Sequence, residues 1–174
     1  MKSKLQPSLQ LNDQLRLRSV TLGDYPFLRG LYRDVRSQEL SVTGWPQAHI
    51  NAFCDSQFDL QDTHYREHYP CAHFYVIEQH GTPVGRVYVS DAPEILRLME
   101  VSLVASRRGQ GVGGTLMHWL AGLSDASQRP IELHVEPENP ARRLYERFGF
   151  ITPEPQAQSG VYLRMRRAPI LQAA

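Results

Sequence analysis

The stretch 106-SRRGQGVGGTLM-117 holds four glycines in twelve residues. Read from Gly109, it has the spacing G-x-G-x-x-G, and read from Arg108 it has the spacing R-x-x-G-x-G. Both spacings are typical of a turn between a strand and a helix, where glycine lets the backbone approach a phosphate group closely. The N–H groups of the first helical turn then bind that group. The stretch therefore predicts a phosphate-binding strand–turn–helix, with a dinucleotide or coenzyme A as the alternative ligands.

Composition indicates one folded domain. The chain has 174 residues, 41% of them hydrophobic, which is enough for a single core and short for two. Its 19 basic and 18 acidic residues leave a net charge of +1, so we expect neither nucleic acid nor a membrane surface as the main partner. No apolar run approaches the roughly 20 residues of a membrane span, and no signal peptide is seen. Two cysteines are too few for a disulfide scaffold, so we expect a cytoplasmic protein.

Periodicity outward from the glycine stretch predicts the order β-α-α-β-β-β-α-β-α-β. The segment 14–20 alternates apolar and polar residues, and His80-Gly81-Thr82-Pro83 separates two β-rich runs as in a hairpin. In the strand that precedes the glycines, we expect Met99, Val101 and Leu103 to share one face. Strands are predicted at 14–20, 73–79, 84–90, 95–104, 131–135 and 161–166, and helices at 27–35, 50–65, 112–123 and 139–148, with a loop at 152–160.

The position of the glycine turn separates the two ligand alternatives. Glu132 and Glu136 follow it at about the 20-residue distance of the dinucleotide fingerprint, so that spacing is compatible with a dinucleotide. However, a dinucleotide fold uses this motif in its first strand–helix turn and needs several further units. Here four predicted strands precede the turn, and only one strand–helix unit and a closing strand follow it. The position favours coenzyme A; a tight turn without a ligand is the third alternative.

Two motifs together resemble a known family. The segment 108-RGQGVG-113, after a strand and opening a helix, resembles the acetyl-CoA signature of the GNAT acetyltransferase superfamily. The segment 141-ARRLYERFGF-150 resembles that superfamily's second signature, A-x-x-L-Y-E-x-x-G-F. The resemblance implies a single-domain α/β GNAT fold over 14–167, with a mixed six- to seven-stranded sheet and helices on both faces. We expect flexible tails at 1–13 and 168–174.

The resemblance also implies how the chain would hold acetyl-CoA. Backbone N–H groups of the glycine turn would bind the pyrophosphate, and Arg108 would add charge. The strand end at 101–103 would pair with the pantetheine amides beside a bulge, and a backbone N–H there would polarise the thioester carbonyl. Asn139 stands one residue later than the family's asparagine, so contact with the cofactor and a helix-capping role both stay open. The cofactor-binding residues that we expect are Val101, Ser102, Leu103, Arg108, Gly109, Gln110, Gly111, Val112, Gly113, Gly114 and Asn139.

The resemblance implies direct acetyl transfer to a primary amine of a small molecule, peptide or protein, with no metal. By the resemblance, Tyr145 occupies the family's general-acid position, from which it would protonate the leaving thiolate. This proton transfer is chemically reasonable, because a phenol and a thiol have pKa values within about two units of each other. The alternative for Tyr145 is a packing aromatic. For the general base, His134 and Glu100 stand where different relatives place a carboxylate, and the absence of any single base stays open as well.

One further motif resembles a zinc site. The segment 64-HYREH-68 matches H-x-x-E-H, but a zinc site needs a third ligand that no second cluster supplies, so we expect a charged helix end.

The amine acceptor has no sequence signature, and a homodimer stays open. A catalytically degenerate coenzyme A-binding GNAT protein is the alternative function. Aromatic residues of the first two helices and the segment joining them could line the acceptor site, with core packing at helical spacing as the alternative for most of them: Tyr32, Trp45, Phe53, Tyr65 and Tyr69.

Overall fold

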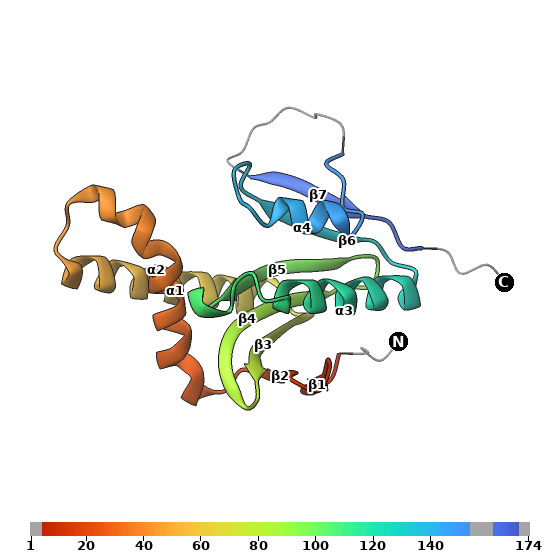
Figure 1. The fold of residues 1–174 in the computed structure, drawn as a ribbon, viewed down its shortest axis with the longest axis horizontal. Helices are drawn as coiled ribbons and strands as arrows, with labels where there is room; N and C mark the ends of the chain where they lie inside the picture. Colours follow the sequence, from red (N-terminus) through yellow and green to blue (C-terminus); the bar gives the residue numbers. More distant parts are fainter. Residues whose placement is uncertain (1–4, 154–161, 171–174) are drawn as a thin grey trace.

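A computed structural model describes residues 5–153 and 162–170 and arranges them around one seven-stranded sheet, in the order β1-β2-β3-β4-β5-β6-β7 (Figure 1). Neighbouring strands are antiparallel except β5 and β6, which are parallel. The mixed α/β sheet predicted from sequence is thus confirmed. Its elements are β1 (Ser8–Gln10), β2 (Leu15–Ser19), α1 (Tyr25–Leu40), α2 (Gln47–His68), β3 (Ala72–Gln79), β4 (Thr82–Asp91), β5 (Leu96–Leu103), α3 (Val112–Ser127), β6 (Ile131–Val135), α4 (Arg142–Arg147) and β7 (Leu163–Arg167).

Helices cover both faces of the sheet. The apolar stripe of α3, including Leu116 and Leu120, packs on side chains of the central strands such as Val87 to form the main core. Because side chains alternate along a strand, the neighbouring residues of β4 point to the opposite face. There α1 and α2 supply buried Leu31 and Phe58. The two helices α1 and α2 extend beyond the sheet on one side (Figure 1).

The N-terminal segment differs from the flexible tail that the sequence predicts for 1–13. Residues 8–10 form β1, which pairs antiparallel with β2, and Leu5 is only 6% exposed in the core. The sequence signal was weak because the strand is short. Pairing to the edge of β2 and burial of a few leucines nevertheless hold the segment in place.

A β-bulge in β5 corrects the expectation that Met99 shares a face with Val101 and Leu103. Leu98 pairs with Val89, and the next pair is formed by Glu100 and Tyr88, so Met99 is the extra residue. A bulge shifts the alternation of side chains by one position. Leu98 before the bulge and Val101 after it therefore face the same core.

The remaining elements lie close to their predicted places. The hairpin between β3 and β4 turns at His80 and Gly81, both with positive φ. The last helix begins at Arg142 rather than at Asn139-Pro140, because residues 139–141 form a turn. The predicted loop at 152–160 lies mostly outside the described residues, as does the first residue of the predicted strand 161–166. No helix among the described residues is long and apolar enough to span a membrane.

Candidate active site

The glycine turn leads directly into α3. Gly109 and Gly111 have φ angles of +71° and +85°, a conformation that residues with a Cβ rarely adopt. Gly111 is the N-cap of α3, so the first N–H groups of the helix have no acceptor within it. A Cβ added at either glycine would enter open space. An approaching pyrophosphate thus meets unobstructed backbone N–H groups, and the turn fits the diphosphate of coenzyme A.

Side chains of the turn hold its own backbone in shape. Arg108 Nε donates a hydrogen bond to the carbonyl oxygen of Leu103 (3.0 Å), which ties the turn to the end of β5. Gln110 Nε2 donates to the carbonyl oxygen of Ser106 (2.6 Å). The anion-binding N–H groups are therefore held in place before a ligand arrives, which lowers the ordering cost of binding.

The strands β5 and β6 diverge beside this turn. They pair only from Leu96 to Leu98 on β5, with Ile131 to Leu133 on β6. After the bulge, residues 101–103 of β5 keep their ladder with β4 but have none with β6. This open backbone edge lies in the stretch for which the sequence predicts binding of the pantetheine amides.

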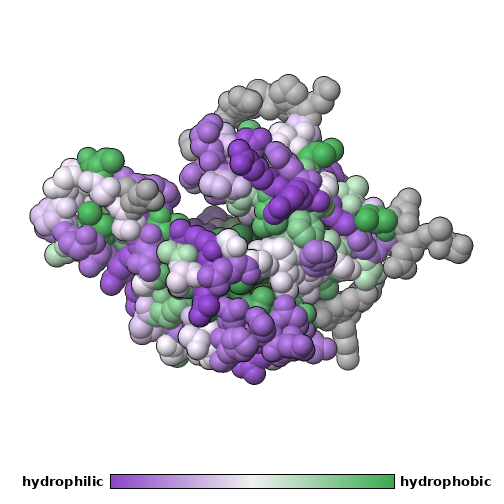
Figure 2. All heavy atoms as spheres, in the orientation of Figure 1, coloured by the Kyte–Doolittle hydropathy of each residue, from purple (hydrophilic) through white to green (hydrophobic). Residues whose placement is uncertain are grey.

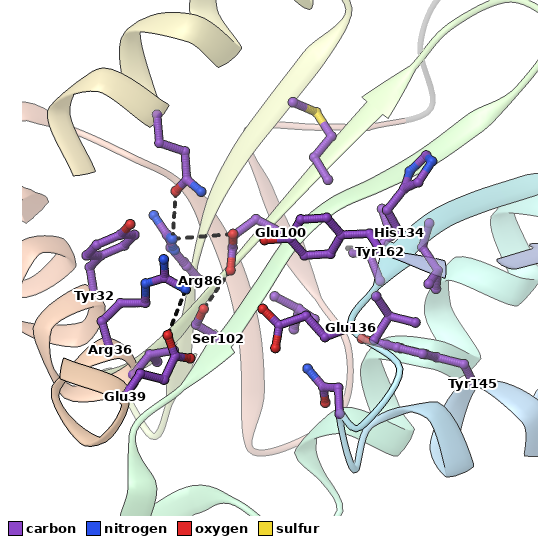
Figure 3. Close-up of a pocket in the computed structure, with 18 residues that line it drawn as sticks. Tyr32, Arg36, Glu39, Arg86, Glu100, Ser102, His134, Glu136, Tyr145 and Tyr162 are labelled. Carbon is purple, nitrogen blue, oxygen red and sulfur yellow. Dashed lines mark hydrogen bonds and ion pairs between the residues drawn. The ribbon is translucent and has the colours of Figure 1, made fainter. Parts of the chain in front are cut away.

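A pocket of about 260 Å³ opens where the two strands diverge (Figure 3). Figure 2 shows the molecular surface hollowed between the α1–α2 part and the α4 part, with hydrophilic side chains on both sides. Six residues predicted for the site line this pocket together: Glu100, Val101, Ser102, His134, Asn139 and Tyr145. Leu103 and the glycine turn at 108–114 are not among its lining residues. The remaining lining residues are Tyr32, Val35, Arg36, Glu39, Gln61, Arg86, Leu98, Met99, Leu133, Val135, Glu136 and Tyr162.

Tyr145 is held in α4 with its side chain only 5% exposed, and its ring packs near that of Phe150 at 5.9 Å. Burial and, to a smaller extent, the charge of Glu100 raise the pKa of Tyr145 to about 12. The phenol therefore keeps its proton at neutral pH. This side chain both packs in the core and reaches the pocket, so the two alternatives for Tyr145 are compatible.

Glu100 lies on the face of β5 that points toward α1 and α2. Its Oε1 accepts a hydrogen bond from Ser102 Oγ (2.7 Å), and its Oε2 lies 3.5 Å from Arg86 Nη2. The carboxylate points into the pocket (Figure 3).

His134 and Asn139 have different surroundings from those two residues. His134 is exposed on β6, and its ring points away from Glu100 and Tyr145 (Figure 3). Asn139 Oδ1 accepts a hydrogen bond from the N–H of Ala141 (2.9 Å), so its capping interaction is present. Because Asn139 also lines the pocket, it is placed to contact a ligand as well.

The entrance to the pocket carries charges that the sequence analysis missed. Arg36 and Glu39 of α1 form an ion pair at 3.0 Å, and Glu136 follows β6 on the opposite side. Arg86 and Tyr162 were also missed. Arg86 alone had a sequence signal, as a charged residue inside the apolar run of β4.

Only one of the five predicted acceptor aromatics, Tyr32, lines the pocket. Trp45 and Phe53 contact each other near the α1–α2 connection, with ring centroids 5.6 Å apart. Tyr65 packs edge-on against Tyr69 at 6.0 Å, and its hydroxyl donates to the carbonyl oxygen of Met99 in the bulge (3.4 Å). The other four aromatics contact neighbouring rings and do not line the pocket.

The H-x-x-E-H motif forms the predicted helix end. The rings of His64 and His68 stack at 4.4 Å, and His68 Nδ1 lies 3.0 Å from the carbonyl oxygen of His64. Within residues 5–153 and 162–170, no group of three His, Cys, Asp or Glu side chains is arranged to hold a metal ion.

Comparison with known proteins decides the family. Residues 70–152 match the family model described as the acetyltransferase (GNAT) domain. The chain thus carries a GNAT acetyltransferase domain over these residues. The matched segment includes β5, the glycine turn, Tyr145 and most of the pocket.

Solved structures of other GNAT proteins share the fold of this GNAT chain. PaiA N-acetyltransferase from Thermoplasma acidophilum, solved with coenzyme A, superposes with a TM-score of 0.66 at 14% identity, covering 88% of this chain and 98% of its own. The ribosomal L7/L12 α-N-protein acetyltransferase RimL, also with coenzyme A, gives 0.62 at 15% identity, with 93% and 98% covered. A SpeG spermidine N-acetyltransferase variant from Vibrio cholerae gives 0.58 at 21% identity, with 90% and 95% covered. The comparison with curated protein sequences gives no significant match.

Proposed function

We propose that this GNAT protein is an acetyl-CoA-dependent N-acetyltransferase that acts on a primary amine by direct attack. The observation that carries the proposal is the pocket, which brings Glu100 and Val101 of β5 together with Tyr145 of α4 at the point where β5 and β6 diverge. Two of the solved GNAT structures contain coenzyme A, which supports the same donor here.

The donor would lie along the turn and the open strand edge. Acetyl-CoA, when bound, supplies the thioester whose acetyl group is transferred. The N–H groups at 109–114 bind its pyrophosphate, because the N-terminus of α3 favours negative charge. The unpaired backbone at 101–103 binds the pantetheine amides, and one of its N–H groups polarises the carbonyl oxygen.

The chemical step needs one bond to form and one to break. The amine nitrogen bonds to the acetyl carbon, and the carbon–sulfur bond breaks as Tyr145 Oη gives its proton to the sulfur. The proton that the amine loses passes to Glu100, directly or through one water, and returns to Tyr145 through solvent. We assign this acceptor-side role to Glu100 rather than His134, because a hydrogen bond from Ser102 and an ion pair with Arg86 hold Glu100 in the pocket, while His134 points away.

The charges of the pocket favour an acceptor that arrives as a cation. Three carboxylates (Glu39, Glu100 and Glu136) line it against two guanidinium groups, those of Arg36 and Arg86. An ammonium group is attracted to such a site and releases one proton to solvent before attack. The second proton, which is lost as the amide forms, is the one that passes to Glu100. The acceptor is a small amine or the amino group of a peptide or protein.

The test combines binding with turnover. Calorimetry with coenzyme A and with NAD, followed by thiol release from acetyl-CoA across amino acids, peptides, polyamines and aminoglycosides, measures both. We expect coenzyme A to bind, NAD not to bind, and at least one amine to release thiol. Binding of NAD alone contradicts the proposal. Coenzyme A binding without transfer to any amine also contradicts it and indicates a GNAT protein that binds the cofactor without catalysis.

A further inference from the structure

Arg86 is a buried arginine in the middle of β4. Its side chain is 2% exposed, and the rings of Tyr32, Phe58 and Tyr88 lie 5.7, 5.4 and 5.1 Å from its guanidinium carbon. Burying a charge is costly, and well-packed apolar residues of similar volume often stabilise a protein as much or more. An arginine at this position therefore needs an explanation beyond packing.

The register of the sheet places Arg86 beside Glu100. Ser102 lies opposite Arg86, and Glu100 lies opposite Tyr88, so these side chains share the face of the sheet under α1 and α2. Arg86 Nη2 donates to Gln61 Oε1 (3.0 Å) and lies 3.5 Å from Glu100 Oε2. Ser102 Oγ donates to the other oxygen of Glu100. Each carboxylate oxygen thus has one fixed partner and a further lone pair for a ligand.

We propose that Arg86 is a positioning residue that keeps the Glu100 carboxylate turned into the pocket, ready to receive the ammonium group of the acceptor. The inference rests on the proposed acetyltransferase function. Among the described residues, Arg86 Nε has no hydrogen-bond partner, so the guanidinium is not consumed by a wider structural network. Among the described residues, the carboxylate that Arg86 contacts is that of Glu100, which we propose accepts the proton of the amine.

The pocket that Glu100 faces also contains Arg36, Glu39, His134, Glu136 and Tyr162. The remaining titratable groups around Glu100 are tyrosines. They come from α1, α2, β4 and α4, and burial raises the pKa of each one above its ordinary value. These groups are therefore neutral in any ordinary assay buffer. Arg86 is the cation at contact distance from the carboxylate. The tyrosines are Tyr32, Tyr65, Tyr88 and Tyr145.

The test compares kcat with KM for the amine in Arg86→Met, which keeps a long apolar side chain between the aromatic rings. Without its partner at 3.5 Å, the Glu100 carboxylate is no longer fixed toward the acceptor, so we expect kcat to fall roughly 10²-fold. Arg86→Lys keeps a charged donor at this position, and we expect it to retain most of the wild-type kcat. The matched control is Arg97→Met, which breaks an arginine–glutamate pair of the same 3.5 Å separation outside the pocket and should leave kcat unchanged.

Two further measurements separate positioning from a purely structural role. In a Glu100→Gln background, Arg86→Met should cause no additional loss of kcat, because the carboxylate it acts through is gone. Calorimetry with coenzyme A should give wild-type affinity for Arg86→Met. If that variant does not bind coenzyme A or does not fold, Arg86→Gln replaces it in the same measurement with the same expectation.

The outcomes are distinct. An active wild type whose kcat is kept in the folded Arg86→Met variant overturns the inference and leaves the proposed function intact. A further loss of kcat in the double variant, beyond that of Glu100→Gln alone, overturns it too. A wild type that transfers no acetyl group to any amine overturns the proposed function, and the role of Arg86 falls with it.

Discussion

Tyr145→Phe removes one oxygen atom from the site and nothing else. The side chain is 5% exposed, and its ring packing near Phe150 is unchanged by the substitution. Within the described part of the chain, Tyr145 Oη has no hydrogen-bond partner. No bond is therefore lost, and we expect the free energy of unfolding to change by less than about 0.5 kcal/mol. Loss of a positioned general acid typically lowers turnover about 10²- to 10⁴-fold, which is the decrease in kcat that we expect.

The pH dependence of the wild type follows from the same residue. Burial first, and then the charge of Glu100, raise the pKa of Tyr145 to about 12, so the proton-donating form persists until the pH rises through that value. We expect no basic limb from Tyr145 in the kcat profile below about pH 10, the ordinary value for tyrosine.

Tyr75→Phe is the matched control. The pKa of Tyr75 is also raised to about 12, chiefly by burial, but its hydroxyl donates to the carbonyl oxygen of Gln6 (2.8 Å) on the other side of the sheet from Glu100. We expect unchanged kcat and a loss of about 1 kcal/mol in unfolding free energy. Thiol-release kinetics measure kcat, and calorimetry checks that coenzyme A affinity is kept. Unchanged kcat in Tyr145→Phe would remove this residue from the chemical step.

Three other predictions concern the turn, the strand edge and acid stability. Gly111→Glu places a carboxylate in the anion-binding turn at a φ of +85°, so calorimetry should show no coenzyme A binding, whereas Gly122→Glu on the exposed face of the same helix should bind normally. In Gly85→Ala, the added methyl group would overlap the carbonyl oxygen of Ser102 in β5. We expect the free energy of unfolding in denaturant to fall by about 1–3 kcal/mol and coenzyme A to bind more weakly. Unchanged values of both would refute the close approach of Gly85 to β5. Hydrogen bonds from Arg18 hold the pKa of Asp24 well below its usual range, so this pair stabilises the protein above about pH 4 and loses that effect as the pH falls further. Asp24→Asn should therefore flatten the decrease of unfolding free energy between about pH 4 and 2, and an equally steep decrease would contradict the assignment.

Much of the fold follows from local sequence signals. The hairpin at 80–83 and the glycine turn were predictable because glycine and short polar residues mark backbone conformations that few other residues adopt. The bulge at Met99 was not, because the alternation of apolar residues looks continuous when the extra residue is itself apolar. The short strand β1 was missed because three residues carry too little periodicity.

The candidate site was also only partly predictable from the sequence. Tyr145 and the turn at 108–114 lie in motifs with fixed spacing, so their places could be named from sequence. Arg86, Glu39 and Tyr162 enter the pocket only through the pairing of strands and the packing of α1 against the sheet, which are long-range contacts. The choice between the two base candidates likewise needed the directions of the side chains.

The most direct test of the account is to incubate the protein with acetyl-CoA and the amine that releases most thiol, and to identify the products by mass spectrometry. We predict one N-acetylated amine for each free coenzyme A formed, with Gly111→Glu giving neither. Free coenzyme A together with unmodified amine and acetate, or no turnover with any amine, would contradict the claim that this chain is an N-acetyltransferase.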